Sequence, residues 1–205
     1  MEVQEKSMYH YHKLGIYDNI WQIGNELIVD DNFNSCYGNI ISNFNTTINL
    51  LPENKQISLD KIIEAYLENK EFTNLDEIKN LLQFSKNIIH NANIYNGELM
   101  LEKYRKDNNP NLPSRLHSIF LTDEKSLAFW KKQLREYRKI VLYRVSLTGN
   151  LFKSSDSFIP DDELTTKEMY EASSKYWNPE FKEEDLCKAE YLFQGKIKVL
   201  DKIDR

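Results

Sequence analysis

The stretch KIVLYRVSL, residues 139–147, is the strongest strand signal in the chain. Its β-branched, aliphatic and aromatic residues are the types that fit a pleated, half-buried surface. Gly149-Asn150 follows almost directly, and this dipeptide predicts a turn. We therefore expect a strand over 139–147, a turn at Gly149-Asn150 and a short partner strand in LFKSS, residues 151–155.

Strands are also predicted on both sides of this stretch. LHSIFLT, residues 116–122, is typical of a strand, and Thr122 can cap a following helix over 123–137. Further along, AEYLFQGKIKVL, residues 189–200, is either a pair of strands or one strand with a bulge around Gly195.

The N-terminal segment MYHYHKLG, residues 8–15, carries two histidines two positions apart. On a strand, His10 and His12 share one face while Tyr9 and Tyr11 share the other, because successive side chains point to opposite faces. Three interpretations are open for the histidine face: a metal site, a buried structural face, or one wall of a pocket for a planar ligand. Zinc would need further ligands in a defined spacing, and no second cluster provides them, so metal binding is disfavoured.

The middle of the chain is predicted to be helical. Ser58 can cap a helix over 59–70, and a second helix follows from about Thr73, with a break expected at Asn96-Gly97. Apolar residues at helical spacing form the stripes expected to pack on the sheet. These residues are Leu59, Ile62, Ile63, Tyr66 and Leu67 in the first helix, and Leu75, Ile78, Leu81, Leu82 and Ile89 in the second.

A helical block between two β-rich segments predicts the α+β class. A capping box of Thr165 and Glu168 marks one more helix in the last segment. We expect residues 1–205 to form a single domain with a helical insert at about 56–107.

The composition argues against several functional classes. The 27 Lys and Arg residues and 32 Asp and Glu residues give a net charge of −5, which argues against broad binding to a phosphate backbone. Cys36 and Cys187 are too few for a disulfide framework, so a reducing compartment is the natural expectation. The sequence shows no apolar run of signal-peptide or membrane-span length. We therefore expect a cytoplasmic protein with no membrane partner.

Two side chains stand out for their context. Glu190 begins an apolar strand, where a carboxylate needs either a partner or a function; the structural alternative is a charge that protects a strand edge. Arg115 stands at the entry to the strand at 116–122, where a guanidinium could clamp a phosphate or carboxylate with two hydrogen bonds. The structural alternative for Arg115 is an exposed residue after a proline-rich turn.

The order of these motifs resembles the ADP-ribosyltransferase superfamily. The order comprises MYHYHK near the start, SRLHSIFLT after a helical insert, the strand IVLYRVSL and the closing AEYLFQGKIKVL. The chain is also similar to an uncharacterised bacterial domain family that we expect to share this fold. The resemblance covers about residues 7–50 and 112–203, and it implies a split antiparallel β-core with a helical insert.

The resemblance also implies roles for individual residues. Glu190 would be the catalytic glutamate, supported by the downstream Gly-x-Ile, and His10 would be the first-strand histidine, with His12 as its rival. The middle motif departs from the family because no tyrosine is centred there. Lys188 stands where arginine-modifying toxins place Glu or Gln, so arginine is disfavoured as the acceptor. The residues expected to bind NAD are His10, His12, Tyr9, Arg115, Ser118 and Phe120, and no metal is expected.

The implied activity is transfer of ADP-ribose from NAD to an acceptor that is a protein, a nucleic acid or a small molecule, in a toxin or defence factor. Breaking the nicotinamide–ribose bond gives an oxocarbenium-like transition state that a carboxylate stabilises. Two alternatives remain: a catalytically silent nucleotide- or partner-binding module of the same fold, and an NAD glycohydrolase.

Overall fold

The computed structural model of the chain describes residues 1–14, 18–33, 35, 37–38, 47–50, 55–68, 75–134, 140–161 and 163–203. The chain is α+β, as predicted, with a five-stranded antiparallel sheet and several helices. It divides into two compact units. The first combines Met1–Asn39 with Gly97–Arg205, and the second is Ile40–Asn96.

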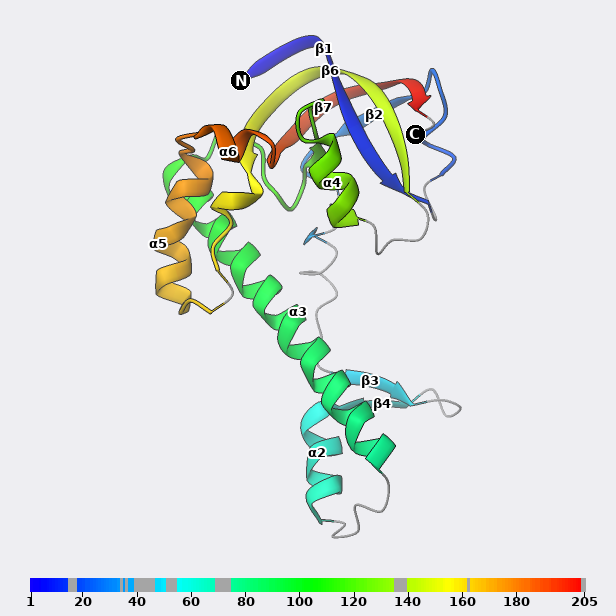
Figure 1. The fold of residues 1–205 in the computed structure, drawn as a ribbon, viewed down its shortest axis with the longest axis vertical. Coiled ribbons are helices and arrows are strands. Elements are labelled where there is room, and N and C mark those ends of the chain that lie inside the picture. The colour runs from blue at the N-terminus through cyan, green and yellow to red at the C-terminus, as the bar shows by residue number, and fades with distance from the viewer. Residues whose placement is uncertain are drawn as a thin grey trace. The chain divides into compact units, whose positions relative to one another are not determined.

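Two long strands form the centre of the sheet in the first unit (Figure 1). β6 (Ile140–Ser155) and β7 (Ala189–Ile203) pair with each other along most of their length. β1 (Glu2–Lys13) lies on the free side of β6. β2 (Glu26–Val29) and β5 (Ile119–Leu121) both pair with the other side of β7, at successive positions along it.

The sheet curls far enough for its two sides to meet. Tyr9 of β1 forms an antiparallel bridge with Thr122, the residue after β5. The backbone N–H of Tyr9 donates to the carbonyl of Thr122 at 3.0 Å, and the reciprocal bond is 2.8 Å long. The strands β1, β6, β7 and β5 therefore form a closed ring around one part of the core.

The predicted turn at Gly149-Asn150 is wrong, because β6 runs straight through it as one strand. Gly149 pairs with Gly195 of β7, and both have positive φ values, of 150° and 138°. A Cβ on Gly195 would lie 2.5 Å from the carbonyl oxygen of Thr148. The two glycines thus let two backbones approach closely, and neither reverses the chain.

Residues 189–200 form one strand and not a pair of strands. The strand has a bulge, but this bulge does not lie at Gly195 as predicted. Arg144 pairs with Asp201, but the next residue, Val145, pairs with Val199. Leu200 is therefore the extra residue of a β-bulge.

The helices of the first unit flank this sheet. In the described part of the chain they are α4 (Leu127–Gln133), α5 (Thr166–Trp177), the short α6 (Glu183–Leu186), a 3-10 turn, Asp156–Phe158, and the part of α3 (Leu75–Asn108) from Gly97 onward. The capping box of Thr165 and Glu168 is confirmed at the start of α5. Thr122 does not cap α4, whose N-cap is Ser126, because the backbone of Thr122 continues the sheet edge. Residues 135–139, at the end of the expected helix, lie outside the described part.

The residues described in the second unit form a hairpin and two helices. They are β3 (Thr47–Leu50), β4 (Lys55–Ser58), α2 (Leu59–Glu68) and the first part of α3 (Leu75–Asn108). α2 begins directly after Ser58, as predicted, and Thr73 lies outside the described residues. The expected break at Asn96-Gly97 is wrong, since α3 continues to Asn108. Leu67, Leu82 and Ile89 of the predicted stripes are 68%, 64% and 60% exposed, so these three side chains do not pack as expected.

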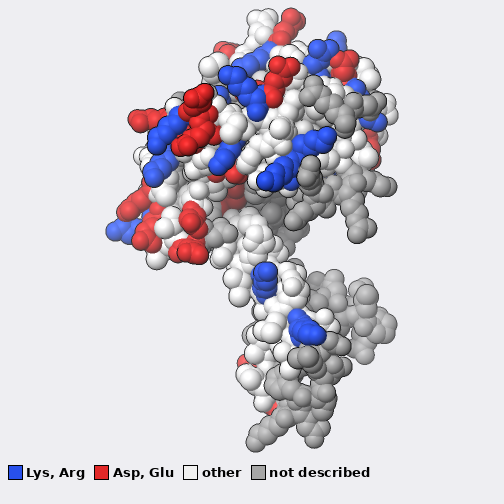
Figure 2. All heavy atoms as spheres, in the orientation of Figure 1, with Lys and Arg blue, Asp and Glu red and all other residues white. Residues whose placement is uncertain are grey.

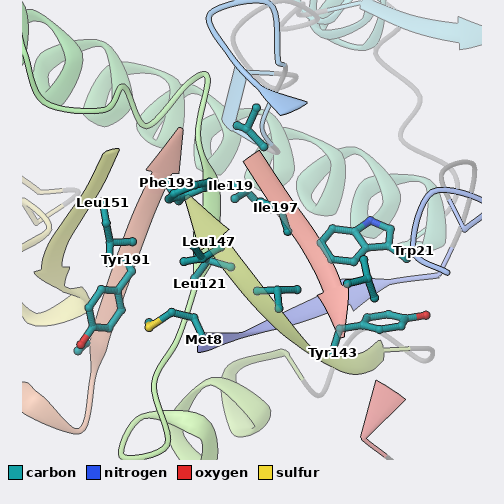
Figure 3. Packing of buried hydrophobic residues seen from close by; sticks show 14 residues of the cluster. Met8, Trp21, Ile119, Leu121, Tyr143, Leu147, Leu151, Tyr191, Phe193 and Ile197 are labelled. Carbon is teal, nitrogen blue, oxygen red and sulfur yellow. The ribbon is translucent and has the colours of Figure 1, made fainter. Parts of the chain in front are cut away.

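Two apolar clusters lie on opposite faces of the sheet in the first unit. The larger cluster lies inside the curl of the sheet, and Met8, Trp21, Tyr143 and Tyr191 belong to it (Figure 3). The second cluster joins Leu192 of β7 to Leu101 of α3 and to Tyr176 and Trp177 of α5. Because side chains alternate along β7, Tyr191 contributes to the larger cluster and Leu192 to the second.

Candidate functional site

Arg115 lies at the centre of a buried polar cluster. Its side chain has no exposed surface, although the residue stands in a turn just before β5. The guanidinium binds Glu98 of α3 through two nitrogens, with Nε to Oε2 at 3.0 Å and Nη2 to Oε1 at 2.9 Å. The third nitrogen, Nη1, donates to Glu190 of β7 and to the hydroxyl of Tyr176 at 2.5 Å. One guanidinium is therefore shared by two carboxylates.

Glu190 is 3% exposed, and its two carboxylate oxygens have different surroundings. Oε1 accepts from Arg115 and from the hydroxyl of Tyr176, the latter at 2.5 Å. Oε2 accepts no hydrogen bond from any residue in the described part of the chain. One oxygen is thus anchored while the other keeps its hydrogen-bonding capacity.

Aromatic rings surround the guanidinium. The Cζ atom of Arg115 lies 4.7 Å from the ring centre of Tyr176, 4.8 Å from that of Tyr37 and 5.1 Å from that of Phe120. Contacts of this kind between a cation and ring faces are attractive, and more so when water is excluded. The cluster is therefore a charged centre inside an aromatic shell.

Burial and charge together set the pKa values of the cluster. Burial raises the pKa of Glu98, against the opposing effect of Arg115. Burial alone would lower the pKa of Arg115, but the carboxylates of Glu190 and Glu98 outweigh it and hold that pKa above its ordinary value. Burial likewise raises the pKa of Tyr176, so its hydroxyl stays protonated and donates. Asp156 also has a raised pKa, through burial and then the charge of Glu190.

Each side chain reaches the cluster from a different element. The last turns of α3 supply Glu98, and α5, which runs beside them in Figure 1, supplies Tyr176. The indole of Trp177 donates to the carbonyl of Leu101 at 2.7 Å and so ties these two helices together. The turn that holds Arg115 is fixed by Ser35, whose hydroxyl donates to the Arg115 carbonyl at 2.8 Å.

His10 and His12 share one face of β1, as predicted, but that face belongs to the larger core. Both rings stack on Trp21, at 4.3 Å and 5.1 Å between ring centres. Glu190 lies in the cluster on the other face of the sheet, so neither histidine side chain faces it. The expectation that His10 or His12 would face Glu190 across one cleft is therefore wrong. His10 instead reaches the backbone of β5, with Nδ1 2.9 Å from the carbonyl oxygen of Phe120.

Tyr9 and Tyr11 share the opposite face of β1 and point to the α4 side. The hydroxyl of Tyr9 donates to Glu124 at 3.1 Å, and that of Tyr11 donates to the carbonyl of Leu127 at 3.1 Å. Tyr11 also lines a surface groove of about 630 Å³ between α4, the start of β6 and the end of β7. Glu190 and the six residues predicted to bind NAD do not line this groove.

The two remaining predicted residues flank the start of β5. Phe120 lies in the aromatic shell of Arg115, so the structure brings it together with Arg115 and Glu190. Ser118 is fully buried, and its hydroxyl has no hydrogen-bond partner among the described residues. Buried hydroxyls are rarely left unpaired, so this one has capacity for a ligand or a water.

Glu98 and Tyr176 are the cluster residues that the sequence reasoning missed. Glu98 follows Asn96-Gly97, where the sequence predicts a break in the helix. The sequence therefore does not predict where the carboxylate of Glu98 lies. A usable signal exists, because Glu98, Leu101, Glu102 and Arg105 follow the spacing of a buried helical stripe. Charged residues in such a stripe point to buried ion pairs.

Outside this cluster, charges are mixed. In Figure 2, blue and red side chains are interspersed over the visible face of the first unit. Within the described ranges, no group of three or more His, Cys, Asp or Glu side chains could hold a metal ion. The described helices include none with the length and apolar composition needed to cross a bilayer.

The fold and this cluster define an α+β protein with a curled antiparallel sheet and a buried arginine shared by two glutamates. The chain belongs to the family described as "Protein of unknown function (DUF2441)", whose family model matches residues 8–205. A search of curated proteins finds none that matches the sequence.

Proposed function

We propose that this protein is an NAD-dependent ADP-ribosyltransferase-like enzyme that uses Glu190 as its catalytic carboxylate. The observation that carries the proposal is the difference between the two oxygens of Glu190. Oε1 is held by Arg115 and Tyr176, while Oε2 has no partner in the described part. A carboxylate fixed at one oxygen is preorganised to act through the other.

The chemistry of the reaction suits such a group. When the bond between nicotinamide and C1′ of the ribose breaks, its electron pair leaves with nicotinamide, and positive charge develops on the ribose. A carboxylate beside the ribose stabilises this charge and can accept a hydrogen bond from a ribose hydroxyl. The acceptor then bonds to C1′ and releases its proton.

The surroundings of Glu190 suit the other parts of NAD. Arg115 acts through Glu190 and not on the pyrophosphate directly, because its three nitrogens already donate to Glu98, Glu190 and Tyr176. Phe120 and Tyr37 provide rings near it, on which a planar base can stack. His10, His12 and Tyr9 lie on other surfaces, and the proposal does not depend on them. The acceptor is a protein, a nucleic acid or a small molecule.

The test is release of nicotinamide from NAD by the purified chain, with and without cell lysate as a source of acceptor. Release that needs lysate indicates a transferase, and release without it indicates the glycohydrolase. Glu190→Gln keeps the size of the side chain but removes its charge, so kcat should fall about 10²- to 10³-fold. The Kd for NAD should change far less, because the charge acts mainly in the transition state.

Glu102→Gln is the matched control for this variant. Glu102 is also buried and also binds an arginine, with its Oε1 2.7 Å from Nη2 of Arg105. It makes no contact with Glu190. It should lose stability without the loss of kcat. Full activity of folded Glu190→Gln would contradict the proposal.

A catalytically silent module of the same fold is the second candidate, and burial favours it. Arg115 is fully buried and Glu190 is 3% exposed, as expected for a structural ion cluster. In that case, calorimetry with NAD would show either no binding, or binding that Glu190→Gln leaves intact with no turnover in any variant.

A further inference from the structure

We propose that Glu98 is a positioning residue that keeps Oε2 of Glu190 free by holding two of the three guanidinium nitrogens of Arg115. This inference rests on the proposed function, because it assigns a role within that site. It adds a third charged residue, which comes from a helix and not from the sheet.

The division of the guanidinium between two carboxylates is the first argument. Nε and Nη2 form one edge of the planar group, and both donate to Glu98, at 3.0 and 2.9 Å. Nη1 meets Glu190 at one oxygen, Oε1, and also donates to the hydroxyl of Tyr176. A guanidinium that presented a whole edge would bind both oxygens of a carboxylate in parallel. With Nε and Nη2 donating to Glu98, the contact of Arg115 with Glu190 is limited to Nη1 and one oxygen.

The rigidity of the support is the second argument. Glu98 is 4% exposed on α3, and one turn further the carbonyl of Leu101 accepts from the indole of Trp177. Trp177 adjoins Tyr176, the residue that holds Oε1 of Glu190. The same helix pair thus fixes Glu98 on one side of Arg115 and Tyr176 on the other.

The third argument is the number of carboxyl groups around one guanidinium. The cluster has two carboxylates for one guanidinium, and Asp156 lies near enough to Glu190 for their charges to interact. A purely structural pair would need one carboxylate, as the next turn of α3 shows, where Glu102 alone pairs with Arg105. In that pair, both oxygens of Glu102 accept from the same arginine, at 2.7 and 3.0 Å. The surplus carboxylate at Arg115 is what leaves an oxygen unbound.

The Glu102–Arg105 pair gives a matched control for the experiment. It lies on the same helix, is similarly buried and has the same chemistry, with Ser114 donating to Glu102 at 2.9 Å. We compare Glu98→Ala and Glu98→Gln with Glu102→Ala and Glu102→Gln, measuring kcat and KM for NAD together with urea unfolding midpoints. Both sites should lose stability, while only the Glu98 variants should lose kcat.

The expected loss for Glu98→Ala is about tenfold in kcat with little change in KM, within the range of coupling between residues of one network. Glu98→Gln keeps one acceptor oxygen and should lose less. If Glu98→Ala does not fold, the comparison of Glu98→Gln with Glu102→Gln carries the test. Folded Glu98 variants with the kcat of their Glu102 counterparts would overturn the proposal.

A second measurement does not need activity. Without the charge of Glu98, Arg115 should bind Glu190 more fully, so Glu190→Gln should lower the unfolding midpoint more in the Glu98→Gln background than in the wild type. Additive midpoints would overturn the positioning role. If the effects of the two substitutions on the unfolding midpoint are not additive but the protein does not turn over NAD, the proposed function is overturned. The sharing of Arg115 between Glu98 and Glu190 would still hold.

Discussion

His10 donates from Nδ1 to the carbonyl oxygen of Phe120, and its ring stacks on Trp21 inside the larger core. Of the three interpretations open for the histidine pair, the structure favours a buried structural face. Nδ1 must carry a hydrogen, because a carbonyl oxygen can only accept. Burial lowers the pKa of His10 to about 4, against the opposing effect of this hydrogen bond.

This lowered pKa predicts how stability depends on pH. Between about pH 6.5 and pH 4, the unfolded chain binds a proton at His10 and the native chain does not. Stability should therefore fall as the pH is lowered through this window, by at most about 3 kcal/mol from His10. Above pH 6.5 the residue is neutral in both states and contributes no dependence.

His10→Asn isolates this contribution in urea unfolding measured from pH 4 to pH 7.5. The amide nitrogen of Asn can replace Nδ1 as a donor to Phe120, but it does not titrate. The difference in unfolding free energy between the wild type and the variant should shrink as the pH falls, since only the wild type loses the His10 term. A difference that is constant over this range would show that His10 has an ordinary pKa in the native state.

At this scale, sequence context identified part of the cluster. Glu190 stands out in the sequence because a carboxylate at the head of an apolar strand needs a partner, and Arg115 stands out because it lies at a strand entry. Each is the partner of the other. Their pairing could not be predicted, because 75 residues separate them and the turn that aims Arg115 inward is fixed by tertiary contacts.

For helices and strands as well, contacts between residues distant in sequence limit what can be predicted. Two helix starts follow from local pattern, after Ser58 and at the capping box of Thr165, whereas the start predicted after Thr122 is wrong. At Gly149 and Gly97 the sequence predicts a chain break, whereas β6 and α3 continue through these residues. In a single sequence, a glycine that reverses the chain cannot be told from one that makes room for a neighbouring backbone, because the neighbour is distant in sequence.

Alanine substitutions should separate these two uses of glycine. Gly149→Ala and Gly195→Ala would each place a Cβ against the facing backbone, at positive φ. Each should lower the unfolding free energy by about 2 kcal/mol or more, measured by urea denaturation. The loss should be similar for both, because each glycine faces the other across β6 and β7.

Gly97→Ala is the control, with the opposite sign expected. Gly97 is helical, and a Cβ there would have no neighbouring atom within 4 Å. Alanine should therefore stabilise α3 by about 0.5–1 kcal/mol. A loss at Gly97 as large as that at Gly149 would mean that the close approach of β6 and β7 is not the cause.

At the scale of the whole molecule, the α+β class could be predicted, because class follows from the order of helical and strand patterns. The division into units follows different boundaries from the predicted insert at about 56–107. The second unit begins at Ile40 and ends at Asn96, so the unit boundary falls inside α3. Periodicity cannot reveal such a boundary, because the backbone of the helix is continuous across it.

The two units should differ in stability, and α3 can report this difference within one helix. The part of α3 after Gly97 packs in the cluster of Leu101, Tyr176 and Trp177, whereas Leu82 and Ile89 in the earlier part are exposed. Helical amides open with the unit that buries them. Amides at 98–108 should therefore exchange with solvent more slowly than those at 78–95.

Hydrogen exchange followed by mass spectrometry checks this, with rates corrected for each residue's intrinsic exchange. We expect protection to rise by about tenfold or more on passing Gly97, equivalent to about 1.4 kcal/mol of local stability. The strands β6 and β7 serve as the internal reference for the first unit, and α2 for the second. Equal protection along α3, with one shared dependence on denaturant, would mean that both units unfold together. If the earlier part of α3 is protected like α2 and the later part like β6 and β7, the boundary between two cooperatively unfolding units lies inside a single continuous helix.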